Sequence, residues 1–224
     1  SGAILRLAAS EEIGSLFGQG ALDLLAGSLT ISGGSASNYT GVISGSNALV
    51  KAGSGALTLS GFSSFTGGLR LGDGALQIGN NMALGTGTLF ATAGRISSDS
   101  TSIRSIANAM VLSGTVAFGD SINTGALTVG GSVTLAANSL LNVISGLTLS
   151  GVVSGTLGLL KIGGAELTLS GLNTYSGSTN VSAGSLTLSG GSAVSNASIL
   201  SIGSAASVKL SSSEQIGGLA GFGA

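Results

Sequence analysis

The sequence predicts an all-β fold: a β-solenoid, or parallel β-helix, of short strands joined by turns rich in Gly, Ser and Asn. Three observations support this prediction: an apolar but glycine-rich composition, regular short strand signals, and internal repetition. The chain has 224 residues, of which 41 are Gly, and 43% are hydrophobic. Disordered chains are poor in aliphatic residues and rich in charge or Pro, so this chain is expected to bury a core.

The composition also excludes several other classes of protein. Charged residues make up 7% of the chain, against about 25% in an average domain, and helix surfaces normally carry many such residues. The chain has no Pro and no Gly at every third position, which excludes collagen. It contains no run of 18 or more apolar residues, so no membrane-spanning segment is expected. A formal net charge of -1 with 7 Lys and Arg predicts no nucleic-acid partner.

The strand signal is a triplet in which two apolar residues flank a Thr. This alternation puts both apolar side chains on one face of a strand and the Thr on the other. Strands this short need neighbours on both edges, which a coil of parallel strands supplies at a spacing of about 4.8 Å. The triplets are Leu29–Ile31, Leu57–Leu59, Leu127–Val129, Val133–Leu135, Leu147–Leu149, Leu167–Leu169 and Leu186–Leu188.

Two internal matches organise the chain. Residues 41–84 align without a gap with residues 151–194, at an offset of about 110 residues. Residues 5–21 match residues 208–224 at a longer offset of about 203 residues, with Glu11 matching Glu214. We therefore expect residues 1–224 to form a single continuous solenoid segment, made of one repeat of about 203 residues plus the start of the next. Solenoid ends usually carry atypical capping repeats, and neither end looks atypical, which favours a window cut from a longer array.

The two sub-repeats share a pattern of spaced Lys, Gly and aliphatic residues. In the second copy the residues of this pattern are Lys161, Gly163, Leu167, Leu169, Gly171, Asn173, Thr174, Tyr175, Gly177, Thr179, Val181, Gly184 and Leu186. In the first copy they are Leu49, Lys51, Gly53, Gly55, Leu57, Leu59, Gly61, Gly67, Gly74 and Leu76. This pattern resembles the autotransporter-associated β-strand repeat. The first copy has Ser63, Ser64 and Phe65 where the family has Asn-Thr-Tyr, and the second departs from the family pattern at Ala165, where Gly is usual.

This resemblance implies a right-handed parallel β-helix belonging to an exported passenger region. It implies an extracellular or cell-surface location in a Gram-negative bacterium, and stalk material rather than an enzyme. It names no cofactor and no activity.

Solenoids of this kind also host enzymes, and in glycosidases the catalytic residues are a pair of carboxylates, so the acidic residues are the candidates for catalysis. They are Glu11, Glu12, Asp23, Asp73, Asp99, Asp120, Glu166 and Glu214. Only Glu11 and Glu12 are adjacent, and adjacent strand residues point to opposite faces, so no glycosidase-like pair is expected. The chain also has no His and no Cys, the usual bases, nucleophiles and transition-metal ligands. We predict no catalytic, cofactor-binding or metal-binding residues, and interpret the acids as solvent-facing or turn carboxylates.

Four further features have simple structural interpretations. Gly72–Gly74 is expected to be a turn rather than a calcium site. Single outward Thr residues do not form the paired array that ice binding would need. Phe65 and Tyr175 are expected to pack in the core at a corner. Lys51 and Lys161 recur at the same place in the two copies and are interpreted as solvated charges or as charges that prevent strand-edge aggregation.

The sequence therefore predicts a structural repeat that acts as a stalk, fibre or spacer, with self-association between repeats or subunits. The alternative is an adhesin module that binds glycans or neighbouring cells through one face of the solenoid.

Overall fold

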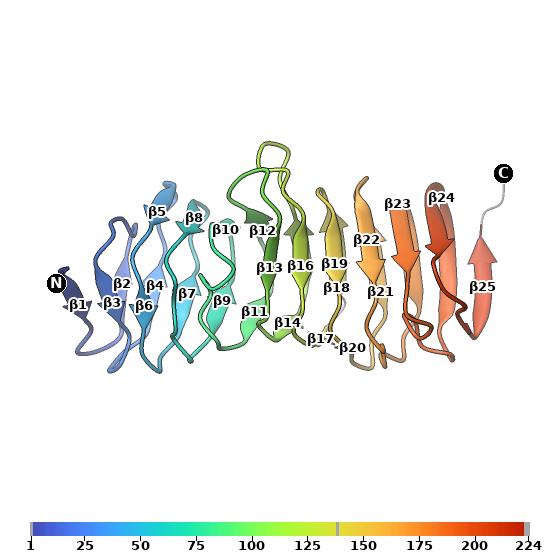
Figure 1. Ribbon diagram of the computed structural model, residues 1–224, viewed down its shortest axis with the longest axis horizontal. Coiled ribbons are helices and arrows are strands. Elements are labelled where there is room, and N and C mark those ends of the chain that lie inside the picture. Colours follow the sequence, from blue (N-terminus) through green and yellow to red (C-terminus); the bar gives the residue numbers. More distant parts are fainter. Residues whose placement is uncertain (1, 138, 222–224) are drawn as a thin grey trace.

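A computed structural model describes residues 2–137 and 139–221. It is a β-solenoid of about 11 turns, without a helix, in which every strand pairing is parallel. One turn of the solenoid is called a rung below. The first and last strands, β1 and β25, lie at opposite ends of an elongated body (Figure 1). The predicted fold class is therefore confirmed. The described residues contain no helix long and apolar enough to cross a membrane.

The strand pairings define three faces that the chain visits in a fixed order. Face A contains β1 (Ile4–Arg6), β3 (Ala21–Asp23), β6 (Ile43–Ser44), β13 (Arg104–Ile106), β16 (Leu127–Val129), β19 (Leu147–Leu149) and β22 (Glu166–Leu169). Face B contains β2 (Glu11–Ile13), β4 (Leu29–Ile31), β7 (Leu49–Lys51), β9 (Leu69–Leu71), β11 (Leu89–Ala91), β14 (Met110–Leu112), β17 (Val133–Leu135) and β20 (Val153–Ser154). Face C contains β5 (Ser37–Tyr39), β8 (Ala56–Leu59), β10 (Ala75–Ile78), β12 (Arg95–Ser98), β15 (Thr115–Phe118), β18 (Ser139–Val143) and β21 (Leu159–Ile162).

The last strands are longer and run around a corner. β23 (Thr179–Leu188) and β24 (Ile199–Leu210) each begin on face C and end on face A, and β25 (Gly218–Gly221) adds to face C. On face A, segments without assigned strands bridge β6 to β13. Ser64 N donates to Ile43 O, Ser63 N donates to Met82 O, and Ser105 N donates to the side chain of Asn81. The three faces thus continue along the whole described solenoid.

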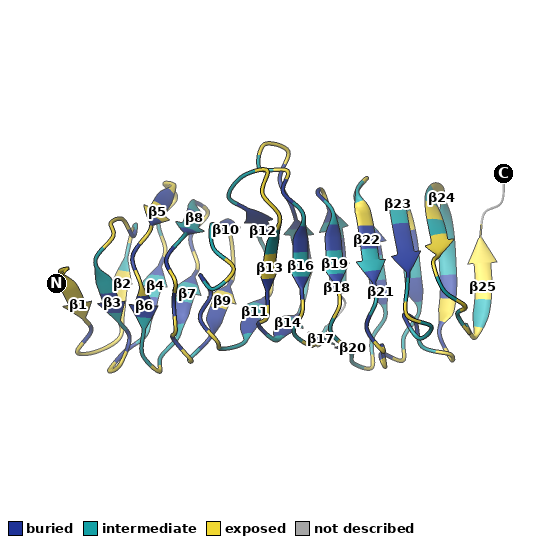
Figure 2. Cartoon of the chain, in the orientation of Figure 1, coloured by how far each residue is buried: buried dark blue, intermediate teal, exposed yellow. Residues whose placement is uncertain are grey.

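The core is a set of stacked aliphatic columns inside the three faces. All seven predicted apolar-Thr-apolar triplets lie in strands, and their apolar residues are buried (Figure 2). Six of the Thr residues are partly exposed on the outward side, whereas Thr187 is buried. On face A, Thr128, Thr148, Thr168 and Thr187 stack directly over one another in a single outward column. A single column, as the sequence predicted, lacks the paired hydroxyls that an ice-ordering surface would need.

The two internal repeats are related to the three faces in different ways. Leu49 stacks through successive pairings on face B as far as Val153, five rungs later. Its sequence equivalent, Leu159, lies shortly after Val153 and pairs on face C. The shorter offset, between the two sub-repeats, therefore spans five complete rungs and one further face. Equivalent strands of the two sub-repeats thus lie on different faces. By contrast, Ile4–Arg6 and their equivalents at positions 207–209, which are related by the longer offset, both lie on face A.

Rung length is regular except in the middle of the chain. Leu29 pairs with Leu49, and Leu49 pairs in turn with Leu69, at equal separations along the sequence. The separation is larger where Thr115 pairs with Leu140. The additional residues form loops that protrude beside β12, β13 and β16 (Figure 1).

Glycine is required where one corner lies directly on another. A Cβ atom added at Gly61 would lie 1.8 Å from Gly41 O, and one added at Gly171 would lie 2.1 Å from Gly151 O. Both carbonyls belong to backbone that the neighbouring rungs hold in place. Gly74, in the predicted turn after β9, has φ of 71°, and its equivalent Gly184 has φ of 70°. These two positions require the left-handed conformation that glycine tolerates.

Substitution at a stacked corner should destabilise the solenoid. We expect Gly171→Ala to lower the free energy of unfolding by about 1–3 kcal/mol, because the new methyl group overlaps a fixed carbonyl. Urea denaturation followed by circular dichroism measures this change. Gly164→Ala is the matched control, since a Cβ there meets nothing within 4 Å, and it should change stability by less than about 0.5 kcal/mol. Equal stability of the two variants would contradict the prediction.

Candidate functional site

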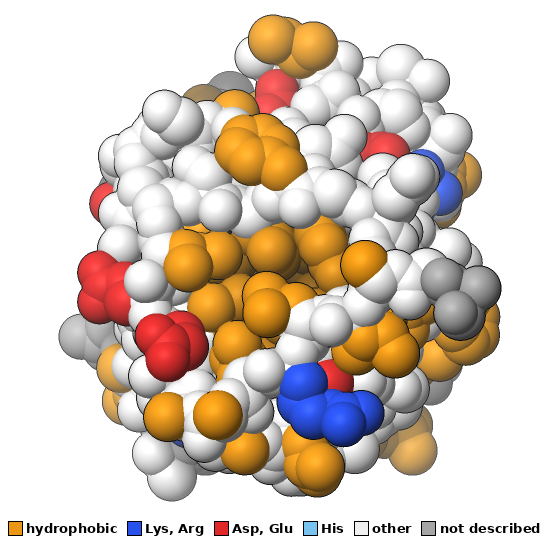
Figure 3. All heavy atoms as spheres, turned by 90° about the vertical axis from the view of Figure 1, so that its left-hand side faces the viewer, with side chains coloured by type: hydrophobic (Ala, Val, Ile, Leu, Met, Phe, Trp, Pro, Cys, Tyr) orange, Lys and Arg blue, Asp and Glu red, His pale blue; other side chains and the backbone are white. Residues whose placement is uncertain are grey.

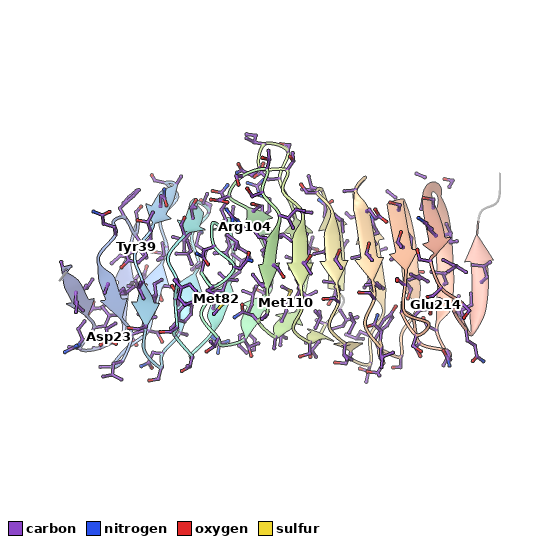
Figure 4. The ribbon with its side chains drawn as sticks, in the orientation of Figure 1. Asp23, Tyr39, Met82, Arg104, Met110 and Glu214 are labelled. Carbon is purple, nitrogen blue, oxygen red and sulfur yellow. The ribbon has the colours of Figure 1, made fainter. Side chains whose placement is uncertain are left out.

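The acidic residues are spread along the solenoid and are used in local contacts. Three of them form salt bridges: Arg6 Nε–Asp23 Oδ2 at 2.9 Å, Arg104 Nη2–Asp99 Oδ1 at 2.7 Å, and Arg95 Nη2–Asp120 Oδ2 at 3.0 Å. Asp23 and Arg104 lie in different parts of the rod (Figure 4). Asp120 differs from the solvent-facing expectation, because it is 5% exposed. Its pairing with Arg95, and a hydrogen bond from Ile122 N at 2.8 Å, compensate for its burial.

Most of the other carboxylates accept hydrogen bonds from nearby groups. Ser32 Oγ donates to Glu12 at 2.6 Å, Gly74 N donates to Asp73 at 2.7 Å, and Thr187 Oγ1 donates to Glu166. The Gly72–Gly74 segment is the turn that the sequence predicted, and the Asp73 carboxylate caps it. Within residues 2–137 and 139–221, no group of three Asp, Glu, His or Cys side chains is arranged to hold a metal ion.

Two shallow hollows lie on the outer surface, and neither contains an ionisable group. The first has a volume of about 480 Å³ and is lined by Thr115, Ser139, Leu140, Gly158, Leu159, Leu160, Ser178 and Asn180. The second, of about 470 Å³, is lined by Leu172, Asn173, Thr174, Ser192, Val194, Ser195 and Asn196. Their hydroxyl and amide groups can form hydrogen bonds with a ligand, but they offer no general acid or base.

The interpretation of Lys51 and Lys161 as solvated or edge charges is wrong. Their exposed fractions are 1% and 0%, respectively. Each lies in an inward column, with Lys51 between Ile31 and Leu71 of the neighbouring rungs. The sequence did contain a signal, because Lys51 is two residues from Leu49, and Lys161 is two residues from Leu159. Period-2 alternation therefore places each Lys on the same inward side as a core leucine.

Both lysines bind backbone carbonyls in the same pattern. Lys161 Nζ donates to Gly163 O at 2.9 Å and to Ala183 O at 2.8 Å, with a longer contact of 3.4 Å to Ile162 O. Lys51 Nζ donates to Gly53 O, and to Asp73 O at 3.3 Å. In each copy one acceptor lies in the corner that follows the lysine and the other lies at the same place one rung later. The ammonium group therefore joins its own corner to the next rung.

Burial also disfavours the charged form of these lysines. Desolvation by burial lowers the pKa of Lys51 and of Lys161 below the usual lysine value, and for Lys51 the nearby Asp73 partly opposes this effect. The salt bridges among the described residues are made by arginines. The lysines therefore act through ammonium–carbonyl hydrogen bonds rather than ion pairs.

A second recurring position satisfies the backbone inside the solenoid. In the second copy, Asn173 Oδ1 accepts from Val153 N at 2.7 Å, and Asn173 Nδ2 donates to Ala193 O at 2.7 Å. In the first copy, the equivalent Ser63 accepts from Ile43 N at 3.2 Å. Both side chains are buried. From the sequence, Asn173 was identified only as a motif residue, and nothing in a single sequence shows which backbone groups a corner leaves without partners.

The aromatic residues of the two copies pack in the core, as predicted. Phe65 and Tyr175 are both fully buried. The Tyr175 hydroxyl forms a hydrogen bond of 2.5 Å with Thr179 Oγ1. Burial raises the pKa of Tyr175 to about 12, more than the hydrogen bond to Thr179 lowers it.

These recurring corners lie within two segments that match a known repeat family. Residues 49–78 and residues 159–188 both match the family described as a passenger-associated-transport-repeat. Each of the two matched segments lies within one of the sub-repeats found in the sequence. The resemblance inferred from the sequence is confirmed at these residues.

The chain is also similar in sequence to part of a much longer curated protein. Over 146 residues the chain is 32% identical to a protein of Brucella suis biovar 1 (strain 1330) named Adhesin BmaC autotransporter. The match covers 63% of this chain and 4% of the relative, so the chain spans a small part of that protein's length. No solved structure matches the chain.

Removing a buried ammonium group should destabilise the fold. We expect Lys161→Met to lower the free energy of unfolding by about 1–3 kcal/mol, because the carbonyls of Gly163 and Ala183 lose their donor without gaining water. Urea denaturation measures the change. Lys209→Met is the control, because Lys209 is exposed. A Lys161→Met variant that is as stable as the parent would contradict this prediction. It would mean that the free-energy cost of desolvating the ammonium group offsets the gain from its hydrogen bonds.

The raised pKa of Tyr175 predicts a loss of stability at high pH. In the unfolded chain this hydroxyl ionises near 10, whereas in the folded chain it ionises near 12. Between these values the folded state binds more protons, so the free energy of unfolding falls with rising pH by about 1.4 kcal/mol per unit for this group. The contribution is fully present below pH 10 and is lost as pH rises through about 12.

Urea denaturation at several pH values measures this slope. Tyr175→Phe should reduce it, while Tyr39, whose pKa is also raised by burial, remains in both proteins. An identical slope in the variant and the parent would contradict the assignment to Tyr175.

Proposed function

We propose that this chain is a non-enzymatic spacer segment of a passenger exposed outside a Gram-negative cell. The observation that carries the proposal is the role of the buried polar residues at equivalent positions of the two copies. Lys51 and Lys161, like Ser63 and Asn173, are buried and bind backbone groups within the solenoid. If these four residues served ligand binding, they would instead lie at the surface.

The shape and composition of the chain support the same role. About 11 rungs at a spacing of about 4.8 Å give a rod roughly 50 Å long. Each added rung lengthens such a rod without changing its cross-section. The match to the passenger repeat, and the similarity to an autotransporter named as an adhesin, support a location on or outside the cell.

A second function is favoured by a specific observation: the relative is named as an adhesin. Under this alternative, the chain binds a glycan or a neighbouring cell through one face. The hollow on face C, with Ser139, Ser178 and Asn180 in its lining, is then the surface to examine first. Its hydroxyl and amide groups are suited to hydrogen bonding with sugar hydroxyls.

One experiment separates the two functions. Beads coated with the purified chain are incubated with host cells and with a glycan array, alongside beads coated with an inert protein of similar charge. We expect equal retention of both kinds of bead, and small-angle scattering of the same preparation should give a rod of roughly 50 Å. Retention that exceeds the control and falls in an Asn180→Ala variant would overturn the spacer proposal in favour of adhesion through face C.

A further inference from the structure

Large apolar side chains are exposed at the same place in the two sub-repeats, directly after a stacked glycine corner. In the first copy, Val42 and Phe62 are 44% and 64% exposed and lie on adjacent rungs. Their equivalents in the second copy, Val152 and Leu172, are 41% and 65% exposed. One exposed apolar residue is ordinary on a protein surface. Exposure at equivalent positions of both copies favours a use for these side chains in an interaction.

A small hollow lies on the rungs that follow Phe62. Ser63 N donates to Met82 O at 3.0 Å, which places Met82 on the rung next to Phe62. None of the residues that line the hollow is ionisable, and Phe62 is not among them. The hollow has a volume of about 180 Å³ and is lined by Asn81, Met82, Gly85, Thr86, Ala107 and Asn108.

Hydrogen bonds between rungs hold the walls of this hollow in place. Asn108 is 5% exposed, and its Nδ2 donates to Gly87 O at 2.8 Å and to Gly85 O at 3.2 Å. On the other side, Ser105 N donates to Asn81 Oδ1 at 3.0 Å. The hollow is therefore formed before any partner arrives, which lowers the cost of binding.

The hollow matches a phenyl ring in size and in chemistry. A cavity of roughly 150 Å³ lined by apolar side chains holds a benzene molecule, so a hollow of about 180 Å³ has room for the ring of one Phe. The thioether of Met82 makes favourable contacts with aromatic rings. Phe62 is exposed and does not line the hollow of its own chain, so its ring is available to a second molecule.

A hollow beside an exposed apolar residue recurs in the second copy. Ser192, Ser195 and Asn196 are the equivalents of Met82, Gly85 and Thr86 at the shorter offset. They line the hollow of about 470 Å³, together with Leu172, the equivalent of Phe62. The arrangement thus belongs to both sub-repeats, although only the first copy combines an aromatic residue with a hollow of matching size.

The charge of the chain favours a second copy of the same chain as the partner. The formal net charge is -1 over 224 residues, so two copies repel each other weakly. Viewed along the rod from the β1 end, the charged side chains form a few separate groups among uncharged ones (Figure 3). Beside the wall residue Ser105, Arg104 is paired with Asp99 at 2.7 Å, which leaves little net charge at the border of the hollow.

We propose that two copies of this chain pair side by side, with Phe62 of each copy inserted into the Met82 hollow of the other. Phe62 and the hollow lie on the same side of the rod, so one patch supplies both halves of the contact, as an isologous interface requires. Because they lie on successive rungs, the two-fold axis is perpendicular to the rods, and the rods are antiparallel. This pairing goes beyond the spacer function, since it adds a lateral contact between spacers.

Methyl NMR signals of the two Met residues report on this contact. Met82 lies in the hollow, whereas Met110 is 1% exposed and serves as the internal reference (Figure 4). A single small contact is weak, so the chain is titrated from about 0.05 to 1 mM. We expect the Met82 signal to move with concentration, because the ring of Phe62 from a second copy approaches it, and the Met110 signal to stay fixed.

Two matched variants test the role of Phe62. Phe62→Ser should raise the concentration of half-maximal shift by about tenfold or more, because an aromatic anchor dominates a small contact. Ile144→Ser is the control, since Ile144 follows β18 and is also exposed, at 39%, and it should leave the Met82 shift unchanged. An unaltered Met110 signal shows that both variants are folded.

A mixed sample shows that the ring comes from another molecule. Phe62→Ser chain carrying labelled Met is mixed with unlabelled parent, which supplies Phe62, or with unlabelled Phe62→Ser chain, which does not. We expect the labelled Met82 signal to move only with the parent. A Met82 signal that is independent of concentration, equal shifts in Phe62→Ser and the parent, or no movement in the mixed sample would overturn the pairing. None of these results bears on the bead experiment, because single rods can act as spacers.

Discussion

Backbone hydrogen bonding between successive rungs is the constraint on which the rest of this structure depends. Parallel strands about 4.8 Å apart place each residue directly over its counterpart in the rung below. Inward positions must then hold side chains that stack, and Leu, Ile and Val fill most of them. At corners such as Gly61 and Gly171 the carbonyl of the rung below occupies the space of a Cβ atom, so only glycine fits. The high Gly content of the sequence follows in part from this geometry.

The buried polar residues complete the same hydrogen-bonding system. A corner interrupts the strand ladder, and buried backbone groups that it leaves over need other partners. Lysine suits this role because its ammonium group has three donors on a flexible stem. One lysine therefore serves two or three carbonyls from adjacent rungs, as Lys161 does for Gly163 and Ala183. Desolvation of the charge opposes this contribution, so Lys51 and Lys161 add less stability than their hydrogen bonds alone suggest.

The sequence predicted the elements of this fold better than their arrangement. The triplets around Thr58 and Thr168 became strands because their alternation and the flanking Gly and Ser residues act locally. The lysine positions were misread because charge was weighed above strand parity, although parity decides which side chains face the core. The one-face rotation between the sub-repeats was not predictable, because it depends on the lengths of all intervening rungs. Those lengths are not constant, since the rung that ends where Thr115 pairs with Leu140 is longer than those on either side of Leu49.

The rotation bears on how the repeats can function. Equivalent strands of the two sub-repeats, β7 and β21, lie on different faces, so a surface group at equivalent positions points in two directions. A ligand site that needed equivalent surface groups of both copies on one side of the rod could not form, because these groups lie on different faces. Interactions directed inward do not depend on which side of the rod a strand occupies, and the buried polar residues Lys51, Lys161, Ser63 and Asn173 make interactions of this kind. The longer offset returns to face A, so surface features carried once per unit would align along a single side of a tandem array. The buried residues at equivalent positions can therefore maintain the solenoid in both copies, whereas surface residues at equivalent positions face in different directions.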